Sequence, residues 1–271
     1  MPLDAILEAQ QSWASRRWPD HSGRRAPTLR ENLILPMSPE IRRQFRRGSG
    51  NELGLRDKPG KMQSLRSSSA LGYNFFAPWV GKNLAPLARV IGVPLGDATI
   101  QFERQFPHGL ASTPPNIDVV LDNEQARPLG VECKFTEPYG HKKPHAALDS
   151  KYFSGGRERW TEVGLPRCQE LAVAIGKTTQ FARLGAAQLL KHILGLTHST
   201  GLPARLVCLW FDSGCSEAAE HRAELARFKA DIDKSVVFTA VTYQDAFRLL
   251  RAEPEPVVGY FNYMASRYFA A

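Results

Sequence analysis

Apolar and polar residues alternate along three stretches in the first half of the chain, the pattern of β-strands with one buried face. The stretches are 98–106, 116–121 and 130–135, separated by short turns rich in proline or polar residues. Because the second and third stretches are so close in sequence, we expect them to form an antiparallel hairpin. In the first stretch the alternation predicts one face made of Ile100, Phe102 and Arg104. The other face is then polar (Thr99, Gln101, Glu103, Gln105).

The second half of the chain alternates between helix-like and strand-like patterns. Helices are expected at 177–196, at 216–232 with Ser216 as N-cap, and at 243–251, and buried strands at 204–212 and 235–243. A long loop, 136–160, precedes them. From Ser68 the order is α, β, β, β, α, β, α, β, α, which predicts an α/β fold with a mixed central sheet and helices on both faces.

The first 66 residues differ from the rest and are predicted to form a basic N-terminal arm, residues 1–66, before a domain of residues 67–271. The arm holds 13 Lys and Arg against 7 Asp and Glu, most of the net charge of +8. One short helix is expected from Ser38 as N-cap and Pro39 at the first helical position. We expect the arm to contact DNA and some of it to order only there; a flexible solubilising tail is the alternative.

Composition places the chain among globular proteins with a polyanionic partner. Of its 271 residues 43% are apolar, enough for a sizeable core, and the pI near 9.5 favours nucleic acid. No run of about 18 apolar residues predicts a membrane span, and the N-terminal residues do not have the basic region of a secretory signal. The four cysteines form no C-x-x-C pair. We therefore expect a soluble, cytoplasmic protein that does not bind membranes.

Two opposite charges lie within the third strand, G-V-E-C-K-F. Glu132 and Lys134 are two residues apart, so they point to the same face. If Leu121 pairs with Leu129, paired positions sum to 250 and Asp118 lies opposite Glu132. The opposite face of the strand is apolar (Val131, Cys133, Phe135).

Two facing carboxylates repel each other unless a cation joins them. Mg²⁺ suits hard oxygen ligands and retains waters for a substrate. A lysine beside it can orient a water molecule or offset charge on a phosphate. Asp118, Glu132 and Lys134 therefore predict phosphodiester hydrolysis, whereas the simpler alternative is an exposed cross-strand ion pair.

N-I-D-V-V-L followed by V-E-C-K-F resembles the core motif of the PD-(D/E)XK nuclease superfamily, which includes many restriction endonucleases. The strand order also resembles its αβββαβ core, over roughly 80–245, and S-S-S-A-L-G-Y-N-F-F-A-P-W resembles a segment of other members. Asparagine and isoleucine stand before Asp118, where the motif's name has proline. The resemblance implies Asp118 and Glu132 as metal ligands, Cys133 as a ligand through its backbone carbonyl, and Lys134 as the catalytic lysine.

Further site residues are implied by the same resemblance. Some members use an earlier acid, for which Glu103 is the candidate as a catalytic and metal-binding residue. Some have a glutamine on the following helix, for which Gln188 or Gln180 is the candidate.

Contacts to DNA phosphates are expected from the loop and from the arm (Lys142, Lys143, Lys151, Arg157 and Arg159; Arg42, Arg43, Arg46 and Arg47). His192 and His198 are expected at the surface.

The resemblance thus implies a Mg²⁺-dependent endonuclease, restriction-like or acting in DNA defence or repair, with Mn²⁺ able to replace Mg²⁺. Duplex DNA is the expected partner, and a homodimer would suit cutting of both strands. Two alternatives remain open. One is a nucleic-acid-binding protein that keeps the nuclease fold without activity, and the other is an α/β protein with a basic arm and no nucleic-acid partner.

Overall fold

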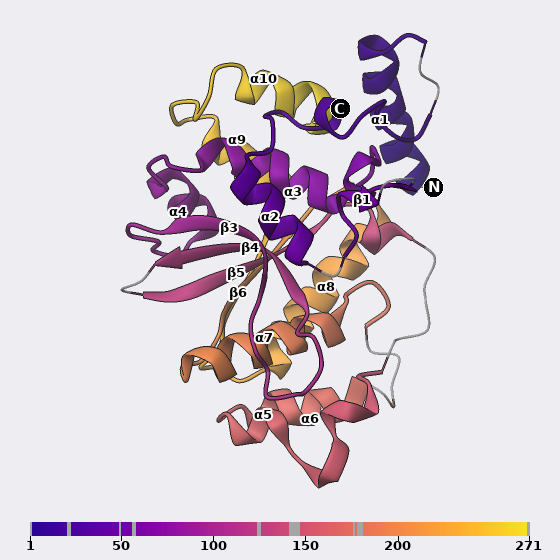
Figure 1. Cartoon of the computed structure of the whole chain (residues 1–271). Helices are drawn as coiled ribbons and strands as arrows, with labels where there is room; N and C mark the ends of the chain where they lie inside the picture. Colours follow the sequence, from indigo (N-terminus) through magenta and orange to yellow (C-terminus); the bar gives the residue numbers. More distant parts are fainter. Residues whose placement is uncertain are drawn as a thin grey trace.

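A five-stranded sheet forms the centre of the protein (Figure 1). The computed structural model describes residues 2–20, 23–48, 50–55, 58–123, 126–140, 147–175, 177 and 181–269. The strands lie in the order β3-β4-β5-β6-β7; the first three are antiparallel and the last three parallel. Their bounds are β3 Thr99–Gln105, β4 Asn116–Asn123, β5 Ala126–Lys134, β6 Arg205–Trp210 and β7 Val237–Thr242. The prediction of an α/β fold with a mixed sheet is confirmed.

The register of the hairpin is the predicted one. Leu121 pairs with Leu129, and the next two pairs, 120 with 130 and 119 with 131, also sum to 250. The ladder between β4 and β5 ends there, one position before Asp118 and Glu132. A register shift between Leu121 and Asn123 accommodates the turn. Asp118 and Glu132 therefore occupy the position just beyond the last pair, where β4 and β5 are no longer joined by the ladder.

Helices cover both faces of the sheet. Above it in Figure 1 lie α2 Pro39–Arg47, α3 Ser68–Phe76, α4 Ala85–Ile91, α9 Tyr243–Leu250 and α10 Tyr260–Met264. Below it lie α5 Arg159–Glu162, α6 Pro166–Ile175, α7 Ala186–Thr200 and α8 Ser216–Asp231. A Cβ at Gly72 on α3 would lie 3.0 Å from Cys133 Sγ, so glycine lets α3 approach the apolar face of β5 closely. Within the described residues, none of the helices has the length and apolarity needed to cross a membrane.

Two helix boundaries differ from the prediction. The helix expected at 177–196 begins at Ala186 and ends at Thr200. Before it, the backbone N–H groups of 182, 183 and 184 all donate to the carboxylate of Glu224, at 2.5–2.8 Å. These bonds hold the chain in a turn where the apolar stripe suggested helix. The helix beginning at Ser216 is capped by Cys215, whose Sγ accepts from Ala218 N, and not by Ser216.

The predicted long loop contains more structure than its polar sequence suggested. Short 3-10 turns at Glu137–Tyr139, Ser150–Tyr152 and Ser154–Gly156 lead to α5. Helix α6 was not predicted; its first backbone N–H groups donate to Asp233, which lies beyond α8. The loop lysines Lys142 and Lys143 lie outside the described residues, as does Gln180.

The N-terminal segment packs on the same core as the sheet. Its buried apolar side chains join the main cluster (Leu33, Met37, Ile41, Phe45, Met62). The Phe45 ring stacks on Phe102 of β3 at 5.5 Å, and Gln44 Oε1 accepts the backbone N–H of Phe102 at 2.8 Å. A small ribbon, β1 Gly54–Leu55 and β2 Lys58–Pro59, follows. The division at residue 66 stays a prediction, although side chains from both sides share this core.

A buried arginine, Arg267, links the N-terminal and C-terminal segments of the described chain. Helix α1, Pro2–Arg17, lies beside the π-helical turn Ala265–Phe269. Arg267 is 2% exposed and donates to both Asn32 O and Asn32 Oδ1 at 2.6 Å. Its guanidinium lies 4.5 Å from the ring centroid of Trp13, and its carbonyl accepts from Gln10 Nε2 at 2.6 Å. These contacts bind residues that are more than 230 positions apart.

Candidate active site

Lys134, at the end of β5, lies between a carboxylate and an amide. Its Nζ is 2.5 Å from Glu132 Oε1 and 3.2 Å from Gln188 Oε1. Alternation along β5 puts Glu132 and Lys134 on one face, as predicted. Gln188 stands in the first turn of α7, which covers that face. The three side chains expected from the motif and the following helix are thus neighbours.

Asp118 lies on the neighbouring strand, where the β4–β5 ladder ends. Its Oδ2 accepts the backbone N–H of Cys133 at 2.7 Å. In an antiparallel strand the N–H and C=O of one residue point to the same side. The carbonyl of Cys133 therefore also points toward β4, past the last ladder pair. This is the direction that its expected role as a ligand requires.

Glu103 occupies the matching position on β3. Pairs 102–119 and 104–117 flank it, which places it opposite Asp118 in the register. Its φ of +51° interrupts the ladder, and its side chain is only 7% exposed. Asn116 Nδ2 donates to its Oε2 at 2.8 Å. Three carboxylates consequently stand in line across β3, β4 and β5.

The positive φ at Glu103 also changes the faces of β3. Arg104 was expected beside Ile100 and Phe102. It instead forms an ion pair with Asp122 and a 3.2 Å hydrogen bond with Gln101, side chains of the other face. A left-handed residue in a strand breaks strict alternation. The prediction for Arg104 is therefore wrong.

His192 was expected at the surface, and that prediction is also wrong. It is 1% exposed on α7, and its Nε2 lies 2.9 Å from Glu132 Oε2. A carboxylate accepts, so Nε2 carries the proton, and Nδ1 has no hydrogen-bond partner within the described ranges. Glu132 is thus held from two sides, by Lys134 and by His192. His198, further along α7, is exposed as expected.

The charges of these groups act on one another. Burial, followed by the charges of Glu132 and Glu103, raises the pKa of Asp118 well above its usual range. Burial would also raise the pKa of Glu132, but Lys134 and His192 lower it to about 2. Burial opposes the charge of Lys134, yet the nearby carboxylates raise its pKa. At neutral pH the site contains a firmly ionised Glu132 and Lys134 pair beside a carboxyl group, Asp118, that resists ionisation.

Asp118, Glu132, Cys133, Lys134 and Gln188 line an open cleft of about 680 Å³. Its opposite wall comes from the N-terminal segment and the start of α3 (Arg25, Glu52, Lys61, Ser64, Arg66, Ser67, Ser68, Ser69). Glu52 is 8% exposed, and Lys61 Nζ lies 3.6 Å from its Oε1, whereas no described residue bonds to its Oε2. Burial raises the pKa of Glu52. The cleft therefore has an acidic floor with Lys134 at its edge and a wall rich in cations and hydroxyl groups.

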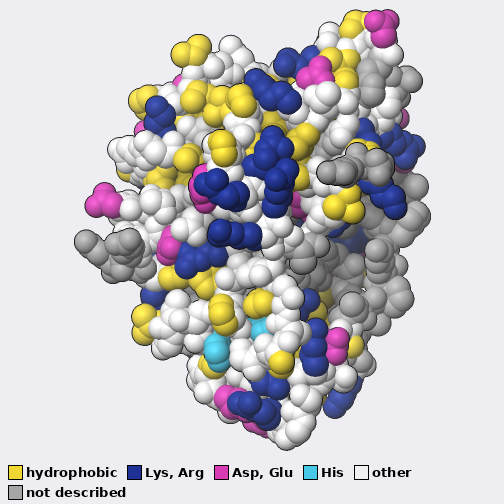
Figure 2. All heavy atoms as spheres, in the orientation of Figure 1, with side chains coloured by type: hydrophobic (Ala, Val, Ile, Leu, Met, Phe, Trp, Pro, Cys, Tyr) yellow, Lys and Arg dark blue, Asp and Glu magenta, His cyan; other side chains and the backbone are white. Residues whose placement is uncertain are grey.

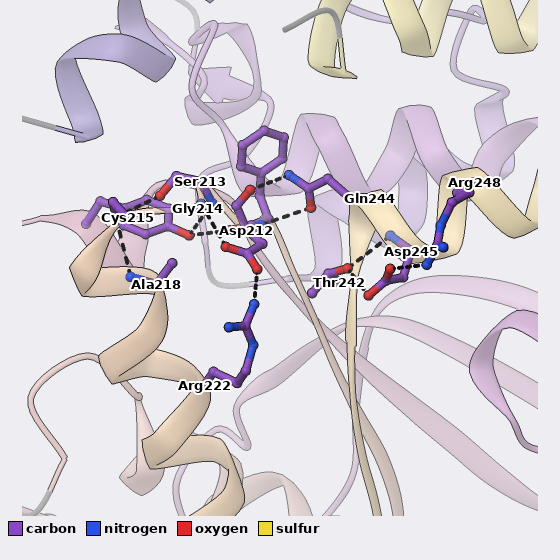
Figure 3. A network of polar contacts seen from close by, with 12 residues as sticks. Asp212, Ser213, Gly214, Cys215, Ala218, Arg222, Thr242, Gln244, Asp245 and Arg248 are labelled. Carbon is purple, nitrogen blue, oxygen red and sulfur yellow. Dashed lines mark hydrogen bonds and ion pairs between the residues drawn. The ribbon is translucent and has the colours of Figure 1, made fainter.

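A polar network supports the end of β5 from the side of β6 and β7 (Figure 3). The backbone N–H of Phe211 donates to Lys134 O at 2.9 Å. The next residue, Asp212, exchanges two hydrogen bonds with the side-chain amide of Gln244 and forms an ion pair with Arg222 on α8. Tyr139 OH donates to the carbonyl of Phe211. Phe211, which this network holds, thus ties the backbone of Lys134 to the end of β6.

The donors at the end of β5 suit Mg²⁺. Asp118 and Glu132 offer carboxylate oxygens and Cys133 offers a carbonyl, all hard ligands, with room for waters. A divalent cation between them would relieve the repulsion that raises the pKa of Asp118. In the described part of the chain no three His, Cys, Asp or Glu side chains are grouped so as to hold an ion. Asp118, Glu132, the Cys133 carbonyl and water are the ligands that the geometry offers, and the metal-binding role expected of Glu103 stays a prediction.

The other residues expected to contact DNA lie on two surfaces. Arg42, Arg43, Arg46 and Arg47 are all exposed on α2. Figure 2 shows Lys and Arg side chains gathered across the middle of this face, where α2 lies in Figure 1. In the loop, Lys151 Nζ is 3.7 Å from Asp149, and Arg157 forms an ion pair with Glu162. Their role in binding stays a prediction.

Two residues of the site were missed by the sequence reasoning. His192 follows Gln188 by four positions, so both lie on one face of α7; that spacing is the signal that identifies it. Glu52 lies in G-S-G-N-E-L-G, a loop-like stretch with nothing to relate it to β5. Only the docking of the N-terminal segment brings it to the cleft.

Comparison with known proteins gives one match. A family model described as "Restriction Endonuclease associating with ARP" matches residues 7–269. Neither a curated protein nor a solved structure matches the chain. The matched range contains the whole sheet, the cleft and most of the N-terminal segment, and it supports a function of the nuclease type.

Proposed function

The chain belongs to this restriction endonuclease family, and from that premise we propose that it is a Mg²⁺-dependent endonuclease that hydrolyses DNA phosphodiester bonds. One observation carries the proposal. Lys134 lies between Glu132 and Gln188 at the strand end where Asp118 accepts the backbone N–H of Cys133. The fold is that of a restriction-endonuclease-like protein, so the site lies on a scaffold suited to this chemistry.

Each residue has a distinct role in the proposed reaction. Asp118, Glu132 and the Cys133 carbonyl would hold the ion, which when bound polarises the phosphate and acidifies a water molecule. Lys134 keeps its proton and offsets the negative charge that develops on the phosphate. Gln188 and Glu132 fix the position of its ammonium group. His192 fixes Glu132 in turn by donating from Nε2 to Oε2.

The opposite wall of the cleft supplies groups that suit the DNA backbone. Arg66 and Lys61 are exposed there. The start of α3 presents Ser67 as N-cap with Ser68 and Ser69 behind it, and a helix N-terminus attracts phosphate. We place the strand that is cut between this wall and the end of β5.

Cleavage of plasmid, linear duplex, single-stranded DNA and RNA in Mg²⁺ or Mn²⁺ tests the proposal. Lys134→Met and Asp118→Asn should each lower the cleavage rate by about 10²–10³, the usual effect of removing a group that stabilises transition-state charge. Lys229→Met removes an exposed lysine of α8 and serves as the matched control. DNA binding in Ca²⁺ should survive in all three.

Two results would contradict the proposal. One is equal cleavage by Lys134→Met and the wild type. The other is tight DNA binding by the wild type without cleavage of any substrate in either metal, which would favour the binding protein without activity.

A further inference from the structure

Arg159, at the start of α5, is a buried cation that forms no ion pair with a carboxylate in the described part of the chain. It is 8% exposed; its two terminal nitrogens make only long hydrogen bonds, to Gly109 O at 3.4 Å and Ser154 Oγ at 3.5 Å. Among the described residues its Nε has no hydrogen-bond partner, and no acid there forms an ion pair with it. A buried guanidinium without an anion is costly. This arrangement suits an anion that comes from outside the chain.

The side chain borders a pocket of about 230 Å³ between the β3–β4 loop, α5 and α7. His108 from that loop and His198 from α7 also line it. His108 is 1% exposed, and neither of its ring nitrogens has a hydrogen-bond partner among the residues that the structure describes. Burial, followed by the charge of Lys151, lowers the pKa of His108, so its neutral ring has one N–H to donate. The pocket thus holds two buried groups with unused donors.

Glu162 is the single acid among the described lining residues; Arg157 and, to a smaller extent, Arg159 lower its pKa, but its hydrogen bonds go to Arg157. Glu162 receives two hydrogen bonds from Arg157, from Nε to Oε1 at 2.9 Å and from the terminal nitrogen to Oε2. Arg157 and Glu162 therefore balance each other at the mouth. The charge left over in the pocket is that of Arg159. A phosphate is larger than one water molecule, which takes about 30 Å³, and the pocket has room for it.

We propose that this pocket binds a backbone phosphate of the DNA whose cleavage was proposed above, as a second contact away from the cleft. The inference rests on that proposed function. His198 follows Gln188 by ten residues on α7, about 15 Å along the helix axis. The two phosphate backbones that border a major groove are about 12 Å apart, a similar separation, so one duplex can contact both places. Figure 1 shows α5 on the same side of the sheet as α7. Arg159, rather than Arg157, is the contact residue.

The test measures the salt dependence of duplex binding in Ca²⁺, where cleavage is not needed. Losing one phosphate contact should make the slope of log K against log salt shallower by about 0.9. At 0.1 M salt that corresponds to about eightfold weaker binding. Arg159→Gln should show both changes, and Arg159→Lys, which keeps the charge, should keep the slope. Arg248→Gln, an exposed arginine on α9, is the charge-matched control and should match the wild type.

A second variant keeps the test informative if Arg159→Gln does not fold. His198→Glu adds a negative charge at an exposed position of the pocket and should weaken binding at least as much. Val258→Glu adds the same charge at a fully exposed site before α10 and should have a smaller effect. An unchanged slope in Arg159→Gln together with equal affinities of His198→Glu and Val258→Glu would overturn the proposal.

Thermal denaturation with inorganic phosphate tests the phosphate site separately from the proposed nuclease function. Inorganic phosphate should raise the thermal midpoint of the wild type and of Arg248→Gln, but not that of Arg159→Gln. Equal stabilisation of all three would overturn the phosphate site even if DNA is cleaved. Stabilisation of the wild type by phosphate or by a nucleotide, with the same duplex affinity in wild type and Arg159→Gln, would overturn the assignment to the DNA backbone.

Discussion

Replacing Glu103 by glutamine should make the protein more stable at alkaline pH. Burial, with the charge of Glu52 as the next cause, raises the pKa of Glu103 from 4.5 to about 8. In the unfolded chain this carboxyl group loses its proton near pH 4.5. The folded protein therefore binds more protons between pH 4.5 and 8, and its free energy of unfolding falls as the pH rises through that window. The amide of the Glu103→Gln variant cannot ionise, and its carbonyl can still accept from Asn116 Nδ2.

The size of the effect follows from the same shift. A rise from 4.5 to about 8 corresponds to at most ~5 kcal/mol, at about 1.4 kcal/mol per pKa unit. Part of it comes from the charges of Glu52 and Glu132. Glu52, whose own pKa is raised by burial, can take up a proton, and the side chains can move apart. We therefore expect Glu103→Gln to gain about 2 kcal/mol over the wild type at pH 8.5 and almost nothing at pH 4.5. For a chain of this size that gain raises the thermal midpoint by roughly 4–8 °C.

Urea denaturation at pH 4.5, 6.5 and 8.5 in EDTA measures the difference without interference from divalent ions. Glu170→Gln, on the exposed side of α6, removes an equal charge and controls for net charge. A difference between Glu103→Gln and wild type that stays constant with pH would refute the reasoning. So would a variant that is less stable than wild type at pH 8.5.

Two further predictions concern the supports of the site. His192→Leu removes the donor to Glu132 Oε2, so the free energy of unfolding measured with urea should fall by about 1.5–3 kcal/mol. Mn²⁺ binding measured by calorimetry should weaken by about 10–100-fold, and His192→Gln should recover part of both losses. Unchanged Mn²⁺ affinity in His192→Leu would count against the positioning role of His192. Gly72→Ala places a methyl group 3.0 Å from Cys133 Sγ and should cost about 1–3 kcal/mol through overpacking of α3 on β5. Adding Cys133→Ala should relieve that strain; an equal loss in the double variant would show that the contact is not the cause.

The sequence was sufficient for features that depend on near neighbours. The alternation in G-V-E-C-K-F set the faces of Glu132 and Lys134, and the hairpin sum of 250 set the register. Both follow from the two-residue period of a strand and from a short turn, so few arrangements were possible. The contact between Gln188 and Lys134 could not be predicted from near neighbours alone, because it depends on where α7 begins. That boundary was predicted nine residues too early, at 177 where the helix begins at Ala186.

The features that were missed depend on contacts between distant segments. Nothing in T-I-Q-F-E-R-Q indicates that Glu103 adopts a positive φ, which sends Arg104 to the other face. His192 lies in a helix with several polar residues, and only the position of Glu132 across the sheet gives it a partner. Glu224 shortens α7 from another helix, 40 residues later. Such effects need the tertiary structure, because local propensity does not contain them.

The hydrogen bonds from Arg267 to Asn32 can form only late in synthesis of the protein. The ribosome makes Asn32 and the segment leading to Lys61 early, yet Asn32 receives the guanidinium of Arg267, which is made more than 230 residues later. The sheet, with Asp118, Glu132 and Lys134, can form before that. Asn32 Nδ2 donates to the carbonyls of Met62 and Ser64 in the basic wall of the cleft, so this wall gains its final anchor only after residues 263–269 have left the exit tunnel. A growing chain would therefore present its acidic floor to the cell before the groove for nucleic acid is fully built.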